Sequence, residues 1–270
     1  MSRNKIDRTG ETNISNEGCV MKIVEYNNGF DIIVEFQDEH KCRVHTRYGH
    51  FKNGQCKNPF FASTYGHGYL GVDKNGNVPN TAELKDGKWV HTWEYNKWQS
   101  MLKRCFDNKY KDRYPTYKGV TCCDRWLCFA NFLEDFEILK QEYNWDNDKK
   151  LNLDKDILNK NNKIYSLENC VLVPDWINKL FIKSDASRGD CPVGVTYHKR
   201  CKKYEAQCNI NGKQISLGYY STPQEAFNAY KIAKEQEIKR VAEDCVSKSY
   251  ITQESRLYNA MISYQVKITD

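Results

Sequence analysis

Residues 151–181 read LNLDKDILNKNNKIYSLENCVLVPDWINKLF and carry the most informative pattern in the chain. The order of apolar and polar runs predicts a strand, a polar loop, a second strand and a helix. In this order Asp154 ends the first strand, Asn169 precedes the second strand, and Asn178 lies on the helix. The residue that follows Asp154 is Lys155, and its chemistry decides how the stretch is interpreted.

The whole chain has the composition of a polar globular protein. Of its 270 residues, 28% are charged and 13% are aromatic, and 41 basic against 35 acidic residues give a net charge of +6. This mild charge permits a polyanionic partner without requiring one. No apolar run approaches the ~18 residues of a membrane span, and residues 1–18 lack the apolar centre of a signal peptide. We therefore expect a soluble protein with no membrane partner.

Twelve cysteines are scattered through this composition. Only Cys122, Cys123 and Cys128 cluster, and their spacing lacks the C-x₂-C pairs of a zinc site. We interpret the cysteines as reduced structural thiols.

Short strand-like runs fill residues 19–61, with Asn27-Asn28-Gly29 as a hairpin turn between the first two. In the third run, basic residues alternate with less polar ones, which places the basic side chains on one strand face. These residues are Lys41, Arg43, His45 and Arg47. The face is either a solvated outer surface or a ribbon that contacts phosphates. Residues 62–88 contain glycines and few apolar residues after Val72, so they predict a linker.

A helical block follows the predicted linker. Two apolar stripes at helical spacing predict helices whose aromatic residues form a core. The stripes consist of Trp98, Met101, Leu102, Cys105 and Phe106, and of Trp126, Phe129, Phe132, Leu133 and Phe136.

The C-terminal third predicts three strands and a helix. The strands are expected at residues 193–199, 203–210 and 214–220, the last two joined by Asn211-Gly212 in a type I′ turn. Thr222-Pro223-Gln224-Glu225 has the residues of a capping box with proline at the first helical position. The helix would cover one sheet face. A further short helix is expected around Leu257, Met261 and Tyr264.

The opposite sheet face is predicted to be open and basic. Residues 186–216 contain six basic residues against two acidic ones, a net charge of +4. The basic residues are Arg188, Lys199, Arg200, Lys202, Lys203 and Lys213. A sheet with one helix-covered face and one basic face suits a ribbon that lies in a DNA groove.

Residues 194–230 resemble the ethylene-response-factor (APETALA-type) DNA-binding domain. The resemblance rests on Gly194-Val195, Leu217-Gly218-Tyr219, and Glu225-Ala226 with Ala229-Tyr230. Tyr204 stands where the family has a sheet tryptophan, and Thr196 and Asn209 stand where many members have arginines. The resemblance implies double-stranded DNA as the partner. The implied contacts are Thr196, His198, Lys199, Arg200, Lys202, Lys203, Tyr204, Asn209 and Lys213, with Arg43 and Arg47 of the N-terminal strands as a second contact.

Residues 98–181 resemble the module of phage-type HNH (His-Me finger) homing endonucleases. The motifs are Trp98-x₂-Met101-x₂-Arg104-Cys105, Tyr117-Lys118-Gly119-Val120, Cys123-x₂-Trp126-x₂-Phe129-x₂-Phe132, Leu153-Asp154-Lys155-Asp156, Tyr165-Ser166-x₂-Asn169-Cys170 and Ile177-Asn178. The N-terminal strands resemble the small β-barrel that often precedes this module. The resemblances imply a multidomain α+β protein of a phage in the cytoplasm of a bacterial host. Its expected segments are a β-barrel-like domain at 18–62, an HNH-like module at 88–184, an APETALA-type domain at 189–243 and a tail at 244–270.

The HNH resemblance assigns Asp154 and Asn178 as ligands of one divalent ion and Asn169 as the residue that ties the loop. Two oxygen ligands with water and phosphate suit Mg²⁺. The family's general base, a histidine beside the aspartate, is replaced by Lys155, and no histidine occurs between residues 91 and 198. Neighbouring carboxylates favour the charged ammonium. Lys155 is therefore expected to stabilise or clamp the phosphate, or Asp156 acts as the base.

Three functions remain open at this stage. The chain is a DNA endonuclease with slow or unconventional metal-dependent phosphodiester hydrolysis, or a DNA-binding regulator derived from a nuclease, or a phage counter-defence protein that binds another protein. We favour a double-stranded DNA-binding protein that carries an HNH-like endonuclease module. The sequence does not predict the oligomeric state.

Overall fold

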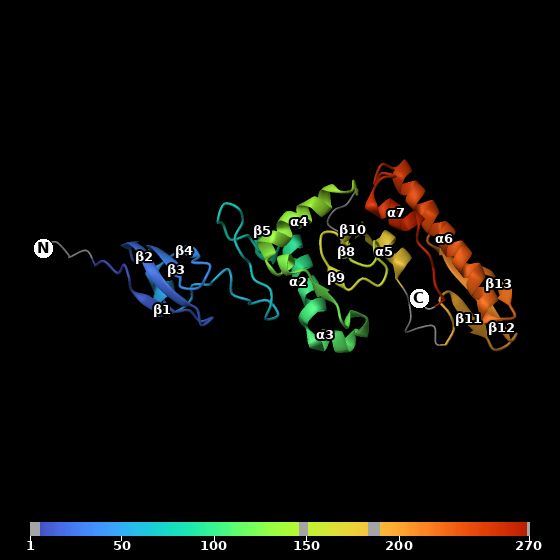
Figure 1. Ribbon diagram of the computed structural model, residues 1–270, viewed down its shortest axis with the longest axis horizontal. Coiled ribbons are helices and arrows are strands. Elements are labelled where there is room, and N and C mark those ends of the chain that lie inside the picture. Colours follow the sequence, from blue (N-terminus) through green and yellow to red (C-terminus); the bar gives the residue numbers. More distant parts are fainter. Residues whose placement is uncertain (1–5, 146–150, 183–189, 269–270) are drawn as a thin grey trace. The chain divides into compact units, whose positions relative to one another are not determined.

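The computed structural model describes residues 6–145, 151–182 and 190–268. The chain divides into two compact units, residues 1–135 and 136–270, and each is described by itself. Helices and strands are mixed along both units (Figure 1), which confirms the predicted α+β class. The predicted junction at 184–189 and the basic residue at 188 lie outside the described residues.

Unit 1 begins with a four-stranded antiparallel sheet in the order β1-β2-β3-β4. Alternation buries every second residue of the two long strands, so that Met21, Ile23, Ile32, Val34 and Phe36 form one core with Phe51. The turn between the long strands is Gly29-Phe30, at the place where the sequence predicts a hairpin. The elements are β1 (Thr12–Ile14), β2 (Val20–Asn28), β3 (Asp31–Phe36), β4 (Arg43–Thr46) and α1 (Tyr48–Lys52).

The predicted β-barrel is wrong, because this sheet is open. In the described chain β1 pairs only with β2, and β4 pairs only with β3. β1 has 3 residues and β4 has 4, so the edges present too few backbone groups to close the sheet. The apolar face is covered instead by α1, which contributes Phe51 to the core.

The predicted linker at 62–88 is only partly extended chain. Residues 64–71 pack against the helical block: the Tyr69 amide donates to the Leu127 carbonyl, and Phe129 donates back to Tyr69. Gly68 lies so close to α2 that a Cβ atom would come within 2.3 Å of the Leu102 side chain. Beyond this segment, β5 (Ala82–Lys85) and β6 (Lys88–His91) form a separate exposed hairpin.

The helical block buries the predicted apolar stripes except for Phe106 and Leu133, which are half-buried. Trp98, Met101, Leu102 and Cys105 face the core along α2, and the Trp98 indole N–H donates to the Trp126 carbonyl at 2.8 Å. Thr92 caps α2 by accepting from the Tyr95 amide. The elements are α2 (Trp93–Phe106), α3 (Asn108–Arg113), η1 (Pro115–Tyr117), β7 (Thr121–Cys122), η2 (Asp124–Leu127) and α4 (Phe129–Gln141).

Unit 2 contains the predicted strand-loop-strand-helix. β8 (Leu151–Asp154) pairs antiparallel with β10 (Val171–Pro174), and Asp154 lies opposite Val171. A short strand, β9 (Ile164–Tyr165), lies in the connection. The helix α5 (Asp175–Phe181) follows β10 directly and packs against both β8 and β10, with Ile177 buried beneath it. The ββα order predicted from the sequence is confirmed.

The C-terminal sheet also follows the prediction. β11 (Val195–His198), β12 (Lys203–Ile210) and β13 (Lys213–Tyr220) are antiparallel in that order. Asn211 and Gly212 have φ of 50° and 73°, as a type I′ turn requires. The helix α6 (Pro223–Ser247) packs across the sheet, and its capping box between Thr222 and Glu225 is fully formed.

The predicted short tail helix is present as α7 (Arg256–Ile262), which packs against α6. Leu257 and Met261 are completely buried, whereas Tyr264 follows the helix and packs edge-on against Phe181 with ring centroids 5.0 Å apart. The tail is therefore part of the unit 2 core.

Candidate metal site and nucleic-acid interface

Within the described residues, one oxygen of the Asp154 carboxyl is hydrogen-bonded to the backbone and the other is not. Its Oδ1 accepts the backbone N–H groups of Asp156 at 2.7 Å and of Ile157 at 2.9 Å, which turns the chain sharply after β8. In the described part of the chain its Oδ2 accepts no hydrogen bond. Burial raises the pKa of the Asp154 carboxyl, and the two backbone N–H groups oppose that rise. A cation at Oδ2 would favour the charged form.

Lys155 points into the protein. Its side chain is 6% exposed, its Nζ lies 2.6 Å from Asp156 Oδ2, and the ammonium sits 5.7 Å from the Tyr165 ring centre. Asp156 is 51% exposed. β8 ends at Asp154, and Lys155 is the first residue of the bend that follows the strand. This geometry makes Lys155 a partner of Asp156.

Asn169 ties two parts of the connection together. Its amide donates to the Ser166 hydroxyl at 3.1 Å, and its carbonyl oxygen accepts from the Asn159 side chain at 3.1 Å. Asn162 adds further bonds to the carbonyls of Lys155 and Ile164. These side-chain bonds hold a connection that has little regular structure of its own.

Asn178 lies on α5, next to buried Ile177, and its side chain is half-buried. Among the described residues no hydrogen-bond partner contacts this amide, which leaves it available to a ligand. The helix that carries Asn178 packs against the strand that carries Asp154. The described residues contain no group of three or more His, Cys, Asp or Glu side chains arranged to hold a metal ion.

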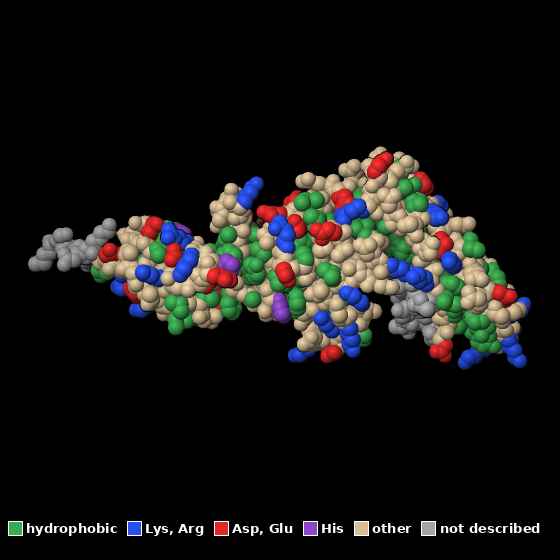
Figure 2. Space-filling view, viewed as in Figure 1, with side chains coloured by type: hydrophobic (Ala, Val, Ile, Leu, Met, Phe, Trp, Pro, Cys, Tyr) green, Lys and Arg blue, Asp and Glu red, His purple; other side chains and the backbone are tan. Residues whose placement is uncertain are grey.

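The predicted basic residues of the C-terminal sheet concentrate in the β11–β12 turn. Lys199, Arg200, Lys202 and Lys203 are all exposed there, and Figure 2 shows Lys and Arg side chains at this end of the sheet. Lys213 is exposed at the start of β13. The turn is tight, because Lys202 has a φ of 54°.

The open sheet face is polar, not basic, and this corrects the prediction. Glu205 lies at its centre, 5% exposed, and accepts hydrogen bonds from Ser216, His198 and Gln207 at 2.5, 2.6 and 2.9 Å. The Ser216 bond and then those from His198 and Gln207 lower the pKa of the Glu205 carboxyl. The face is completed by Gln214, which donates to Gln207 at 2.7 Å.

The net charge of residues 186–216 does not show which side chains share a face of the sheet, whereas the alternation along β12 does. Every second residue of β12 faces away from α6, and this set is Lys203, Glu205, Gln207 and Asn209. Thr196 is exposed on the same face, opposite Glu205. Tyr204 belongs to the other set: it packs on the helix-facing core and against Tyr197, with centroids 4.9 Å apart. Because alternate residues of a strand point to opposite faces, the β12 sequence itself assigns Glu205 to the open face and Tyr204 to the helix-covered face.

Only part of the predicted basic run lies in a strand, where Arg43 and His45 are both exposed. β4 covers only Arg43–Thr46, so Lys41 and Arg47 lie outside it, and Lys41 has a φ of 49°. Arg43 pairs with Glu35 at 2.9 Å, and His45 Nε2 lies 2.6 Å from Asp31 Oδ1. Arg47 precedes α1 and stacks over Phe30 at 5.9 Å. The acids of β3 therefore oppose this basic charge.

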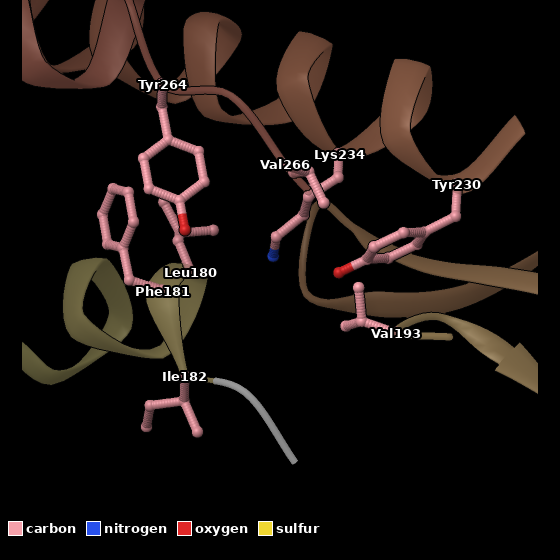
Figure 3. A pocket seen from close by; sticks show the side chains of 8 residues that line it. All are labelled: Leu180, Phe181, Ile182, Val193, Tyr230, Lys234, Tyr264 and Val266. Atoms are coloured by element: carbon pink, nitrogen blue, oxygen red, sulfur yellow. The ribbon is translucent and has the colours of Figure 1, made fainter. Parts of the chain in front are cut away.

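Described residues of unit 2 line a small cavity and a wider groove, and Asp154 lines neither. A cavity lined by Leu180, Phe181, Ile182, Val193, Tyr230, Lys234, Tyr264 and Val266 has about 20 Å³ (Figure 3), enough for one water molecule. Burial lowers the pKa of Lys234, whose amino group points into this cavity. A wider open groove of about 560 Å³ runs between α5 and α6, and Asn209 lines it alone among the predicted site residues.

Comparison with known proteins adds no relationship. No protein-family description matches the chain, and no curated protein and no solved structure matches it. In the part of the chain that the structure describes, no helix is long and apolar enough to cross a membrane.

Proposed function

We propose that the chain binds double-stranded DNA through the β11–β12 turn and the open face of its sheet. The observation that carries the proposal is the turn itself, where Lys199, Arg200, Lys202 and Lys203 are exposed within five residues beside an uncovered sheet face. Cations at the end of a two-stranded ribbon contact phosphates, while polar side chains on the face reach base edges.

The polar face gives the proposal a direct consequence for base recognition. Thr196, Gln207, Asn209 and Gln214 present hydroxyl and amide groups, which donate to and accept from base edges. The oxygens of Glu205 are already occupied by neighbouring side chains. Sequence selection is therefore assigned to Thr196 and Asn209 and to the remaining N–H groups of Gln207 and Gln214, and affinity to the cations of the turn.

The test is the salt dependence of duplex binding by the full chain, followed by fluorescence anisotropy. Each phosphate that a cation neutralises contributes about −0.9 to the slope of log K against log salt. Replacing Lys199, Arg200, Lys202 and Lys203 by Gln should reduce the slope by up to about 3.6. A matched control replaces four exposed lysines elsewhere, Lys74, Lys85, Lys88 and Lys239, by Gln. Equal effects in the two variants, or a flat salt response in the parent, would remove the DNA proposal and favour a protein partner.

A second candidate function, metal-dependent phosphodiester cleavage, is favoured by the Asp154 Oδ2 atom, which accepts no hydrogen bond from the described residues. A partly buried carboxylate with one oxygen tied to backbone N–H groups and the other available fits a hydrated Mg²⁺, which takes few protein ligands. The unbonded amide of Asn178 is the second ligand of the proposal. Bound there, the ion would polarise the phosphate and lower the pKa of a water molecule.

The side chains around this carboxylate limit the rate of such a reaction. Lys155 Nζ lies 2.6 Å from Asp156 Oδ2, so these two side chains are engaged with each other, and no histidine directly follows Asp154 in the sequence to act as a base. A correctly positioned general base raises the rate of such a reaction by a factor of about 10²–10⁴. We therefore propose slow nicking with DNA binding as the principal activity.

Nicking of supercoiled plasmid separates this candidate from binding alone. Nicking in Mg²⁺ or Mn²⁺ that stops with chelator and is lost in Asp154→Asn and in Asn178→Ala supports cleavage. Both variants should still bind duplex DNA, because neither residue lies in the β11–β12 turn. Duplex binding without metal-dependent nicking leaves DNA binding as the function and excludes the enzyme.

A further inference from the structure

A basic and aromatic surface in unit 1 uses none of the side chains assigned above to duplex binding. Residues 97–118 contain seven Lys and Arg residues against two acids, Asp107 and Asp112, a net charge of +5. Figure 2 shows Lys and Arg side chains gathered over the segment labelled α3 in Figure 1. The α3 surface is defined by Lys103, Arg104, Lys109, Lys111, Arg113 and Lys118 with Tyr110, Tyr114 and Tyr117.

The aromatic rings of the α3 surface form one contiguous group. The Tyr110 ring centre lies 4.7 Å from that of Tyr114 and 5.6 Å from that of Tyr117. Lys103 sits 5.1 Å above Tyr110, and Arg104 sits 5.6 Å from the Tyr117 ring centre. Tyr114 is 45% exposed at the edge of this group. Cations and rings are thus interleaved, with one ring open to solvent.

The positive charge of this surface is not neutralised from within. In the described chain no ion pair involves Lys103, Lys109, Arg113 or Lys118. Asp107 directs its carboxylate to the Tyr110 amide at 3.1 Å, where it caps α3. Burial lowers the pKa of nearby Lys97, and the positive charge of Arg104 lowers it further. Such a cluster of like charges is relieved by a polyanion.

We propose that the α3 surface binds single-stranded nucleic acid, with Lys109, Arg113 and Lys118 on phosphates and an unpaired base stacked on Tyr114. Single-strand binders combine a positive track with aromatic platforms, and each stacked base contributes to affinity without regard to its identity. A duplex keeps its bases paired and would use only the cations. An acidic peptide would likewise leave the exposed ring unused.

The first experiment measures binding of a fluorescein-labelled dT 20-mer to the full chain at several salt concentrations. Replacing the exposed residues Lys109, Arg113 and Lys118 by Gln should weaken binding at least tenfold. Because each phosphate neutralised on a single strand contributes about 0.7 to the slope of log K against log salt, the magnitude of this slope should fall by about 2. The control replaces exposed Lys74, Lys85 and Lys88 by Gln, with the same charge change in the same unit, and should bind like the parent. Equal weakening by both variants would overturn the proposal.

The second experiment tests the ring. Tyr114→Leu should weaken binding of the 20-mer by roughly fivefold to a hundredfold, the range of one lost base stack, and leave duplex binding unchanged. Equal loss of single-strand and duplex binding, or no loss, would refute the stacking. A glutamate-rich peptide that competes as well as the 20-mer would point to an acidic protein instead.

The β11–β12 turn variant distinguishes this proposal from duplex binding. It should lose affinity for the duplex and keep affinity for the 20-mer. Loss of both in that variant would assign the single strand to the C-terminal sheet and overturn the role of the α3 surface.

Discussion

Arg256 offers the sharpest test of how unit 2 holds its strand-loop-strand-helix. Its Nε and Nη2 donate to both oxygens of Glu142 at 2.8 and 2.6 Å. Its Nη1 donates to the carbonyls of Leu167 and Glu168 at 3.1 and 2.8 Å, and Nη2 also reaches that of Cys170 at 3.3 Å. One side chain from the tail thus fixes the connection just before β10. We predict that Arg256→Met loosens this connection.

The expected loss of stability follows from the number and exposure of these bonds. The Arg256 side chain is 39% exposed and that of Glu142 is 21% exposed, so solvent screening limits the ion pair to about 1 kcal/mol. The three carbonyl bonds contribute about 0.5–1.5 kcal/mol each. Methionine retains part of the packing. We therefore expect Arg256→Met to lower the free energy of unfolding by about 3 kcal/mol.

Urea unfolding monitored by circular dichroism measures the loss in the free energy of unfolding. Hydrogen exchange monitored by mass spectrometry shows which part of the chain is loosened. Exchange should accelerate in peptides that cover residues 166–174 and stay unchanged in residues 12–46 of unit 1. The control is Arg200→Met, which removes an exposed arginine of the same unit. A loss below about 0.5 kcal/mol, or faster exchange of equal size in both variants, would refute the role given to Arg256.

Four further predictions concern the sheet, the carboxylate and two backbone positions. Hydrogen bonds lower the pKa of Glu205 in the folded state. Its contribution to the free energy of unfolding is therefore complete above the unfolded pKa of about 4.3 and is lost as the pH falls through the lower folded pKa. In Glu205→Gln the urea midpoint should consequently vary less between pH 5 and pH 2 than in the parent. Burial raises the pKa of the Asp154 carboxyl, so its ionised form opposes folding at pH 7. Asp154→Asn should therefore raise the melting temperature in the absence of metal. In this variant Mg²⁺ should not raise the melting temperature further. Gly194→Ala places a Cβ atom 2.1 Å from the Tyr230 ring at a φ of 73°. It should lower the free energy of unfolding in urea by about 3 kcal/mol. A much smaller decrease would contradict the contact between residue 194 and Tyr230. Thr222→Ala removes the cap of α6 and should cost about 1 kcal/mol, measured in the same way, whereas Thr222→Ser should cost little.

The local chemistry of the C-terminal third made it predictable. The Asn211-Gly212 turn and the Thr222 capping box need only residues that are neighbours in sequence, and both form as expected. The strand-loop-strand-helix of residues 151–181 was predictable for the same reason, because each boundary is marked by a change of polarity.

Features that depend on distant residues were not predictable. The pairing of Arg43 with Glu35 and of His45 with Asp31 follows from the register of β3 against β4, which no local motif specifies. Sheet closure likewise depends on how far the edge strands extend. The open edges of the sheet and the acids opposite its basic strand could therefore not be predicted from local sequence.

At the candidate metal site the sequence located the residues but not their directions. The order Asp154-Lys155-Asp156 suggests three groups that converge, whereas the structure turns Lys155 inward to Asp156 and ties one oxygen of Asp154 to backbone N–H groups. The burial of a lysine beside the Tyr165 ring depends on the path of the connection, which its polar sequence leaves undefined.

The hydrogen bonds around Glu205 have a consequence for the DNA binding proposed at the open sheet face. His198, Gln207 and Ser216 are each held by the same carboxylate, and Gln214 is held in turn by Gln207. Their rotamers are fixed before any ligand arrives, so the entropy of ordering them is lost on folding and not on binding. In the proposed interface these four side chains therefore present a preset pattern of donors and acceptors, whereas the exposed side chains of Thr196 and Asn209 and the long cations of the β11–β12 turn can still change rotamer on binding.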